Sequence, residues 1–284
     1  MKNKRGVSFL ILFFVYAVAF SAAWLLCGRF MEGGLSDVCN QFLFIDVAAT
    51  VIVFVFSVIF GNASVYDPYW SIQPIVFVTA AAVIHGVTAA GAAVLVAVWF
   101  WGLRLTANWA YTFHGLAFQD WRYTLLKEKT KWFYPVVNFF GIHMIPTLVV
   151  FCCMMPAVDI IHSGFSFRPR MLTGIFISLA GATLQGIADI QMHRFKKHGG
   201  KGFIRTGLWK KGRHPNYLGE ILMWWGVAVT WLLSSPDMSG WQWMVLGAVL
   251  NTCLFLFISI PLADNHQARK PGFAGYKKET RLFI

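Results

Sequence analysis

The stretch IQPIVFVTAAAVIHGVTAAGAAVLVAVWFWGLRL, residues 72–105, contains no Asp, Glu, Lys or Arg other than Arg104. It is too long for one membrane-spanning helix, which needs about 20 apolar residues. Its apolar character is broken only around His85, Gly86 and Gly91. We therefore expect two helices, 72–90 and 91–107, that form a hairpin.

The rest of the chain has the same character. Of its 284 residues 57% are hydrophobic and only 13% are charged, against about 25% charged in soluble domains. Apolar runs near 20 residues recur, and each indicates a membrane span. Together with the hairpin, the predicted spans are 7–26, 42–60, 136–157, 171–192, 217–234 and 241–262. The sequence thus predicts an all-α polytopic transmembrane bundle of eight spans, or seven if the hairpin is one helix.

The distribution of cations favours eight spans. With a cytoplasmic N-terminus, the predicted cytoplasmic segments hold 21 of the 24 Lys and Arg residues, and the opposite side holds only Arg29, Arg168 and Arg170. This follows the positive-inside rule. We expect cytoplasmic N- and C-termini, a single integral membrane domain over 1–284, and location in a bacterial inner membrane. The net charge of +12 suits an anionic leaflet, and the loops are too short for a nucleic-acid surface.

Metal and nucleophilic chemistry are not indicated. The five cysteines have no metal or redox spacing, and the histidines form no H-x-x-x-H or HExxH pattern. No serine lies in a nucleophile elbow. We therefore expect no metal site.

Two polar segments on the predicted cytoplasmic side lie in the first half of the chain. In NASVYDPYW, residues 62–70, Asp67 precedes a proline and belongs either to a turn or to the mouth of a pocket. In RLTANWAYTFHGLAFQDWRYTLLKEK, residues 104–129, Arg104 and Asn108 share one helical face. Arg104 lies near a membrane end, where it either snorkels to the interface or pairs with an anionic ligand.

Two further segments lie in the second half. In GIADIQMHRFKKHGGKGFIRTGLW, residues 186–209, Asp189 and His193 are four residues apart, and no Rossmann fingerprint follows. In KKGRHPNYLGEILMWWG, residues 210–226, a helix begins at Pro215. The first turn of that helix, with the adjacent cations, could hold an anion. Glu220 lies about a turn inside the membrane and needs a partner there.

These motifs resemble a known family. GLWKKGRHPNYLGEILMWWG, residues 207–226, and DNHQARKPGFAGYKKETRLFI, residues 264–284, resemble the steroid 5-alpha-reductase superfamily of membrane enzymes. RLTANWAYTFHGLAFQDWRY and NASVYDPYW look like a bacterial branch of it. The resemblance covers 60–284 and is weaker over 1–60. It implies that residues 186–284 bind NADPH and that a carbon–carbon double bond conjugated to a carbonyl is reduced. The implied substrate is lipid-like, apolar and reached from the bilayer.

The resemblance also implies site residues. Asp189, Asn216 and His266 look like the family's cofactor aspartate, nicotinamide asparagine and C-terminal cofactor histidine, and Arg104 matches its helix-end arginine. The set expected to bind NADPH is Arg104, Asn108, Asp189, Arg194, Lys196, Arg205, Arg213, His214, Asn216, Tyr217, Glu220, His266 and Tyr276.

The proton donor departs from the family pattern. The steroid enzymes carry a tyrosine three residues before the arginine, where this chain has Trp101. Indole cannot release a proton in that role, and the partner glutamate of those enzymes has no evident counterpart. Tyr111, Tyr69 and Asp67 are therefore the candidate acids, and the substrate need not be a steroid.

One alternative is another membrane enzyme. R-H-P-x-Y-x-G also resembles isoprenylcysteine and phospholipid methyltransferases, which use S-adenosylmethionine. Those enzymes pair the motif with two consecutive glutamates, where this chain has Asp264 and Asn265. The departure favours the reductase. A transporter or scaffold would scatter charges through the spans, whereas here they gather at one end. The oligomeric state stays open.

Overall fold

The computed structural model describes residues 2–27 and 33–284, and these form helices with no β-strand beyond one isolated bridge between Gly212 and Arg281. Arg29, used in the topology prediction, lies outside the described residues. The helices are α1 (Lys2–Cys27), α2 (Leu35–Ile59), α3 (Tyr69–His85), α4 (Ala89–Thr112), α5 (Trp121–Thr130), α6 (Tyr134–Val136), α7 (Ile145–His162), α8 (Met171–Lys197), α9 (Pro215–Ser234), α10 (Trp241–Leu254), α11 (Ile260–Gln267) and α12 (Phe273–Glu279). π-Helical turns join α6 to α7 and α10 to α11.

The predicted hairpin is confirmed, because α3 and α4 are separate helices. α3 ends at His85, and Gly86 follows with φ +81°, a conformation that glycine adopts without strain. The side chain of Thr88 then caps α4 by accepting a hydrogen bond from the Gly91 N–H at 3.1 Å. Seven helical stretches of the described residues are long and apolar enough to cross a membrane. The 17-residue α3 is shorter than these. The predicted all-α polytopic bundle is thus confirmed.

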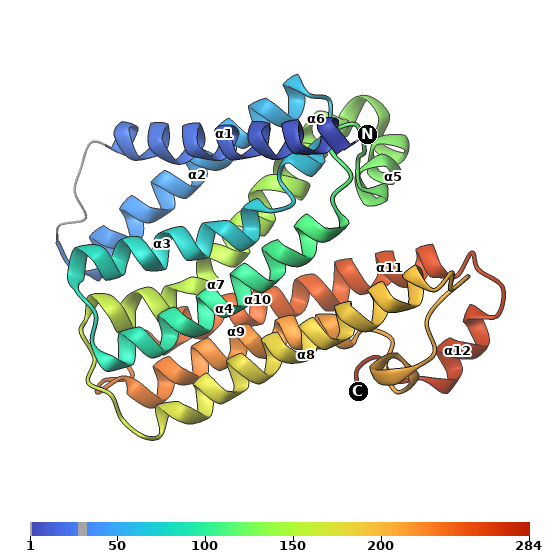
Figure 1. Cartoon of the computed structure of the whole chain (residues 1–284). Coiled ribbons are helices and arrows are strands. Elements are labelled where there is room, and N and C mark those ends of the chain that lie inside the picture. Colours follow the sequence, from blue (N-terminus) through green and yellow to red (C-terminus); the bar gives the residue numbers. More distant parts are fainter. Residues whose placement is uncertain (1, 28–32) are drawn as a thin grey trace.

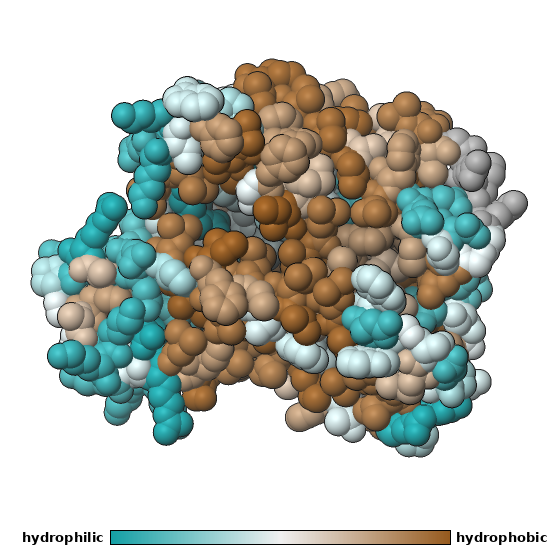
Figure 2. Space-filling view, turned by 180° about the vertical axis from the view of Figure 1, so that it is seen from behind, coloured by the Kyte–Doolittle hydropathy of each residue, from teal (hydrophilic) through white to brown (hydrophobic). Residues whose placement is uncertain are grey.

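The surface of the bundle suits a membrane. The long helices lie side by side, and both ends of the chain lie at the same end of the bundle (Figure 1). Figure 2 shows a hydrophobic band across the middle of one face, with hydrophilic side chains gathered at its ends. Phe13, Phe176 and Phe257 are each more than 70% exposed. In a bilayer these side chains would face lipid. The cytoplasmic location of the two termini stays a prediction.

The most extensive helix–helix contact among the described residues is between α8 and α9. A Cβ at Gly181 would lie 2.7 Å from the carbonyl oxygen of Gly219, and a Cβ at Gly219 would lie 2.7 Å from Cβ of Gln185. Gly226 makes the same kind of approach to Ser178, whose hydroxyl donates to the Met223 carbonyl at 3.0 Å. Small residues let the two backbones touch. This seam fixes the position of α9 relative to α8.

The first half of the bundle contains buried polar groups that the sequence analysis did not anticipate. Asp46 is 0% exposed, and its two carboxylate oxygens accept hydrogen bonds from the Tyr69 hydroxyl and the Gln73 amide, each at 2.8 Å. Nearby, the Thr147 hydroxyl bonds those of Thr50 and Tyr66 at 3.0 and 2.8 Å. We call these side chains the closed network: Asp46, Thr50, Tyr66, Tyr69, Gln73 and Thr147.

Candidate functional site

A cleft of about 400 Å³ opens between α4 and α8. These helices run in the same direction, and both end where the two chain termini lie (Figure 1). Because residues three or four apart share a helical face, the polar side chains of each helix point to the same interface. The α4–α8 cleft is lined by Arg104, Asn108, Tyr111, Gly186, Asp189, Ile190, His193, Arg194 and Lys197.

Two polar contacts cross the cleft. Nη1 of Arg104 donates to Oδ2 of Asp189 at 2.9 Å, and Nε2 of His193 hydrogen-bonds Oδ1 of Asn108 at 2.6 Å. Gly186 leaves room for the arginine, since a Cβ there would lie 3.0 Å from Cδ of Arg104. Each i, i+4 pair thus shares one helical face, as predicted, and the structure shows that the two faces meet between α4 and α8.

The cleft has an excess of positive charge. Asp189 is the one acid in the lining, against the cations Arg104, Arg194 and Lys197. Within the described residues, Nε and Nη2 of Arg104 have no hydrogen-bond partner. Arg194 and Lys197 likewise form no ion pair there. An anionic ligand would balance this charge.

Glu220 lies on α9, and both of its carboxylate oxygens accept hydrogen bonds from neighbouring indoles. Its Oε2 accepts from Nε1 of Trp101 at 2.7 Å, and its Oε1 accepts from Nε1 of Trp224 at 3.0 Å. The residue is 1% exposed, so these bonds supply the partners that a carboxylate at this depth requires. Trp101, which occupies the position of the steroid enzymes' tyrosine, thus acts here as a neutral donor to a buried acid.

Asp264 is surrounded by Arg213 and His214 at the start of α9 and by Lys277 of α12. Its Oδ1 bonds Nε2 of His214 at 2.9 Å, and its Oδ2 lies 2.9 Å from Nζ of Lys277 and 3.6 Å from Nε of Arg213. Burial lowers the pKa of His214, although the Asp264 carboxylate opposes that shift. Arg213 also donates through Nη1 to the Thr280 carbonyl at 2.8 Å. These contacts fasten the C-terminal segment to α9.

Other predicted cofactor residues hold the C-terminal loops. The hydroxyl of Tyr276 donates to the Trp209 carbonyl at 2.6 Å, and burial raises the pKa of Tyr276. Arg205 donates to the Gly272 carbonyl at 3.1 Å and lies over the ring of Tyr276. Lys196 is exposed. The structure therefore does not bring these three residues into the α4–α8 cleft.

Tyr217 lies among the charged groups. Its ring is parallel to that of His214 at a centroid distance of 5.2 Å. The charges of Arg122, Asp120, Asp189 and Asp264 all act on its hydroxyl. Asn216 is half-buried and makes no hydrogen bond through its side chain within 2–27 and 33–284. A ligand that entered beside Tyr217 would therefore meet groups from α5, α8, α9 and α11.

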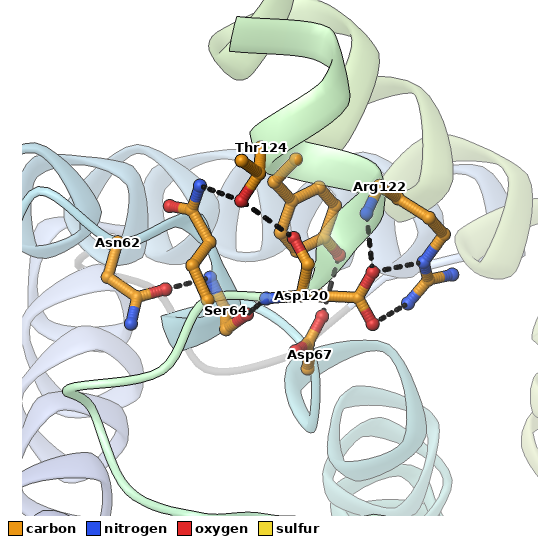
Figure 3. Close-up of polar contacts among 8 residues, drawn as sticks. Asn62, Ser64, Asp67, Asp120, Arg122 and Thr124 are labelled. Carbon is orange, nitrogen blue, oxygen red and sulfur yellow. Dashed lines mark hydrogen bonds and ion pairs between the residues drawn. The ribbon is translucent and has the colours of Figure 1, made fainter. Parts of the chain in front are cut away.

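A set of contacts that we call the α5 clamp holds the start of α5 (Figure 3). The Tyr123 hydroxyl donates to Oδ1 of Asp67 at 2.6 Å, and Nε of Arg122 donates to Oδ1 of Asp120 at 2.8 Å. The Asp120 N–H donates to the Ser64 hydroxyl at 2.9 Å. Burial raises the pKa of Asp67 to about 6, although Arg122 and Tyr123 work to lower it. The clamp fastens α5 to the loop before α3.

The α5 clamp lies beside His266. The ring of Trp121, the first residue of α5, stacks on that imidazole with centroids 3.8 Å apart. His266 thus contacts the first half of the chain rather than the α4–α8 cleft. Figure 2 shows this face hollowed near its hydrophilic end.

The structure also places the three candidate acids. Tyr111 lines the α4–α8 cleft and is 63% exposed. Tyr69 is fully buried with its hydroxyl bonded to Asp46, and Asp67 is bonded to Tyr123. Neither of the last two lies in the cleft lining. The residues that line the cleft or contact the predicted site residues, and that the sequence analysis did not select, are Trp121, Tyr123, His193, Lys197 and Asp264. For His193 the signal was available, since it lies four residues after Asp189.

The fold and the cleft define a polytopic helical membrane protein with a cationic site at one end of its bundle. Within that class, the chain belongs to the family described as "Protein of unknown function (DUF1295)", which it matches over residues 53–280. No solved structure matches the chain.

Curated relatives match more distantly. An uncharacterized protein of Schizosaccharomyces pombe is 26% identical over 181 residues, 53% of this chain and 52% of the relative. A 3-oxo-5-alpha-steroid 4-dehydrogenase 1 of Macaca fascicularis is 29% identical over 118 residues, 41% of each chain. The steroid 5-alpha-reductase DET2 of Gossypium hirsutum is 35% identical over 86 residues, 30% of each chain. The matches span about half or less of these relatives. They support the predicted superfamily.

Proposed function

We propose that this protein is a membrane-embedded reductase. It uses NADPH to reduce a carbon–carbon double bond conjugated to a carbonyl group in an apolar, lipid-like substrate. The observation that carries the proposal is the cationic α4–α8 cleft in a chain related to steroid 5-alpha-reductases. The apolar surface of the bundle supports a substrate that arrives from the bilayer (Figure 2).

The residues of the cleft fit a polyanionic cofactor. Arg104 has unpartnered N–H groups, and Arg194 and Lys197 have no acid paired to them among the described residues. In this proposal these cations attract the phosphates, while the uncommitted amide of Asn216 hydrogen-bonds the carboxamide. NADPH, when bound, would supply the hydride.

Proton transfer is assigned to Tyr111, the one candidate acid in the cleft lining. As hydride adds to the β-carbon of the substrate, the π electrons of the double bond move onto the carbonyl oxygen and form an enolate. The Tyr111 hydroxyl then gives its proton to the α-carbon as the enolate collapses, and the phenolate regains a proton from water.

The experiment is a thermal-shift titration of the purified protein in detergent with NADPH, NADH and S-adenosylmethionine. A ligand that binds only the folded state raises the melting temperature, and the stabilisation grows with the logarithm of its concentration relative to Kd. We expect stabilisation by NADPH. Stabilisation by S-adenosylmethionine alone would establish the methyltransferase alternative, and stabilisation by none of the three would favour a non-enzymatic role.

A further inference from the structure

The contact between Trp121 and His266 joins the two halves of the molecule. Their rings stack with centroids 3.8 Å apart and planes 26° from parallel. This is the shortest centroid distance of the aromatic contacts among the described residues. Trp121 is on α5 and His266 is on α11, 145 positions later in the chain. The stack is therefore a tertiary contact, not a local one.

The backbone around Trp121 is held on both sides. Trp121 is the first residue of α5, and the side chain of Asp120 caps that helix by accepting from the Arg122 N–H at 2.9 Å. Asp120 is in turn bonded through its N–H to Ser64, and Tyr123 is bonded to Asp67 (Figure 3). The α5 clamp thus fixes the residues on both sides of Trp121, and the stack with His266 orients its indole, which is 36% exposed.

The imidazole of His266 has no comparable anchor of its own. Neither of its ring nitrogens makes a hydrogen bond to any residue within 2–27 and 33–284. The side chain is half-buried, and Arg269 and Lys270 are near enough to act on it electrostatically. Stacking fixes the face of the ring and leaves the edge, where both nitrogens lie, free for a ligand.

We infer that Trp121 is a positioning residue that orients His266, which lies outside the α4–α8 cleft, for hydrogen bonding to the part of the cofactor that extends beyond the cleft. The inference rests on the proposed function, because it needs NADPH as the ligand of His266. It also gives the α5 clamp a purpose: Ser64, Asp67 and Asp120 hold the start of α5, from which Trp121 reaches His266. A sequence segment far from the C-terminal loops thereby contributes to cofactor affinity.

The test is a double-mutant cycle on NADPH affinity, measured by titration of purified protein. Aromatic pairs contribute about 0.5–1.5 kcal/mol, which corresponds to about a twofold to tenfold change in Kd. We expect Trp121→Leu to weaken NADPH binding by that factor, and Trp121→Phe to retain most of the affinity. Trp132→Ala is the control, since Trp132 is 87% exposed just after α5. In the His266→Ala background, Trp121→Leu should change affinity by less than about twofold.

The outcomes separate the two proposals. If the unmodified protein does not bind NADPH, the proposed function fails and the inference falls with it. If the unmodified protein binds NADPH but Trp121→Leu binds equally well, only the inference is wrong. Additive losses in the cycle would also overturn it, because Trp121 would then act independently of His266. Melting curves check the folding of each variant, and the Phe variant keeps the test decisive should the Leu variant unfold.

Discussion

The α4–α8 cleft and the closed network place polar groups in the same apolar bundle, yet they differ in accessibility and in charge. Both carboxylate oxygens of Asp46 are bonded and the residue is 0% exposed. In the cleft the Arg104 side chain is 16% exposed and two of its guanidinium nitrogens have no partner among the described residues. Polar groups that hydrogen-bond one another stabilise a fold, whereas cations with no paired acid favour the binding of an anionic ligand. We therefore expect the closed network to stabilise the fold and the α4–α8 cleft to bind a ligand.

The largest effect is expected at Arg104. Arg104→Ala removes a cation from the cleft and leaves Asp189 without its ion-pair partner. Charge-assisted hydrogen bonds are worth about 1.5–3 kcal/mol, so we expect NADPH affinity to fall by about tenfold to more than a hundredfold. Isothermal titration in detergent measures the change.

A matched control is Arg168→Ala, which removes an arginine from the loop before α8. It should leave NADPH affinity unchanged. If both variants bound NADPH like the unmodified protein, the cleft would not be the cofactor site, and the contrast with the closed network would be lost.

A smaller effect is expected at Asp46, and on a different property. Asp46→Ala removes the carboxylate that accepts from the Tyr69 hydroxyl and the Gln73 amide at 2.8 Å, and leaves these donors only longer contacts to the backbone carbonyl of residue 46 and to Sδ of Met154. This weakening in a buried site costs about 1–3 kcal/mol. We expect a lower melting temperature in detergent with unchanged NADPH affinity of the folded protein. Asp46→Asn should cost less, since its amide oxygen still accepts from Tyr69 and Oε1 of Gln73 is unpartnered among the described residues. Lost NADPH binding at an unchanged melting temperature would make the closed network part of the site.

The short helices α5 and α12 were not predicted, whereas the long apolar helices were, because the bilayer imposes length and hydropathy on each of them. The turn at Gly86 was readable for the same reason, since it interrupts an apolar run that is too long for one helix. The facing of Arg104 and Asp189 could be predicted only in part. Helical spacing showed which face each residue occupies, but not that α4 and α8 are neighbours.

Contacts between residues far apart in the sequence could not be predicted in this way. Trp101 bonds Glu220 from 119 residues away, and no periodicity in either helix specifies that pairing. Asp46 was passed over because it lies inside an apolar run, and its partners on α3 became evident only once the helices were packed.

The RHPNYLGE motif shows why a resemblance to two families could not decide between them. Gly219 is needed for the close approach to α8, and His214 and Arg213 surround Asp264. These roles concern helix packing and attachment of the C-terminal segment. A reductase and a methyltransferase built on this helix pair would both need them. We therefore favour the reductase over the methyltransferase because of the cationic cleft rather than because of the motif.

The smallest expected effect concerns the α5 clamp, which belongs neither to the closed network nor to the α4–α8 cleft. Burial raises the pKa of Asp67 to about 6 in the folded protein, above its ordinary value of 3.8. A carboxyl group that binds its proton more tightly when folded favours folding most below pH 4, and that contribution declines as the pH rises through about 6. We expect the melting temperature to fall modestly between pH 5 and pH 7. Asp67→Asn, which cannot titrate but can still accept from Tyr123, should flatten that dependence. If the melting temperature of this variant depended equally steeply on pH, another group would cause the dependence. Protonation of Asp67 would then not contribute to the stability of the clamp.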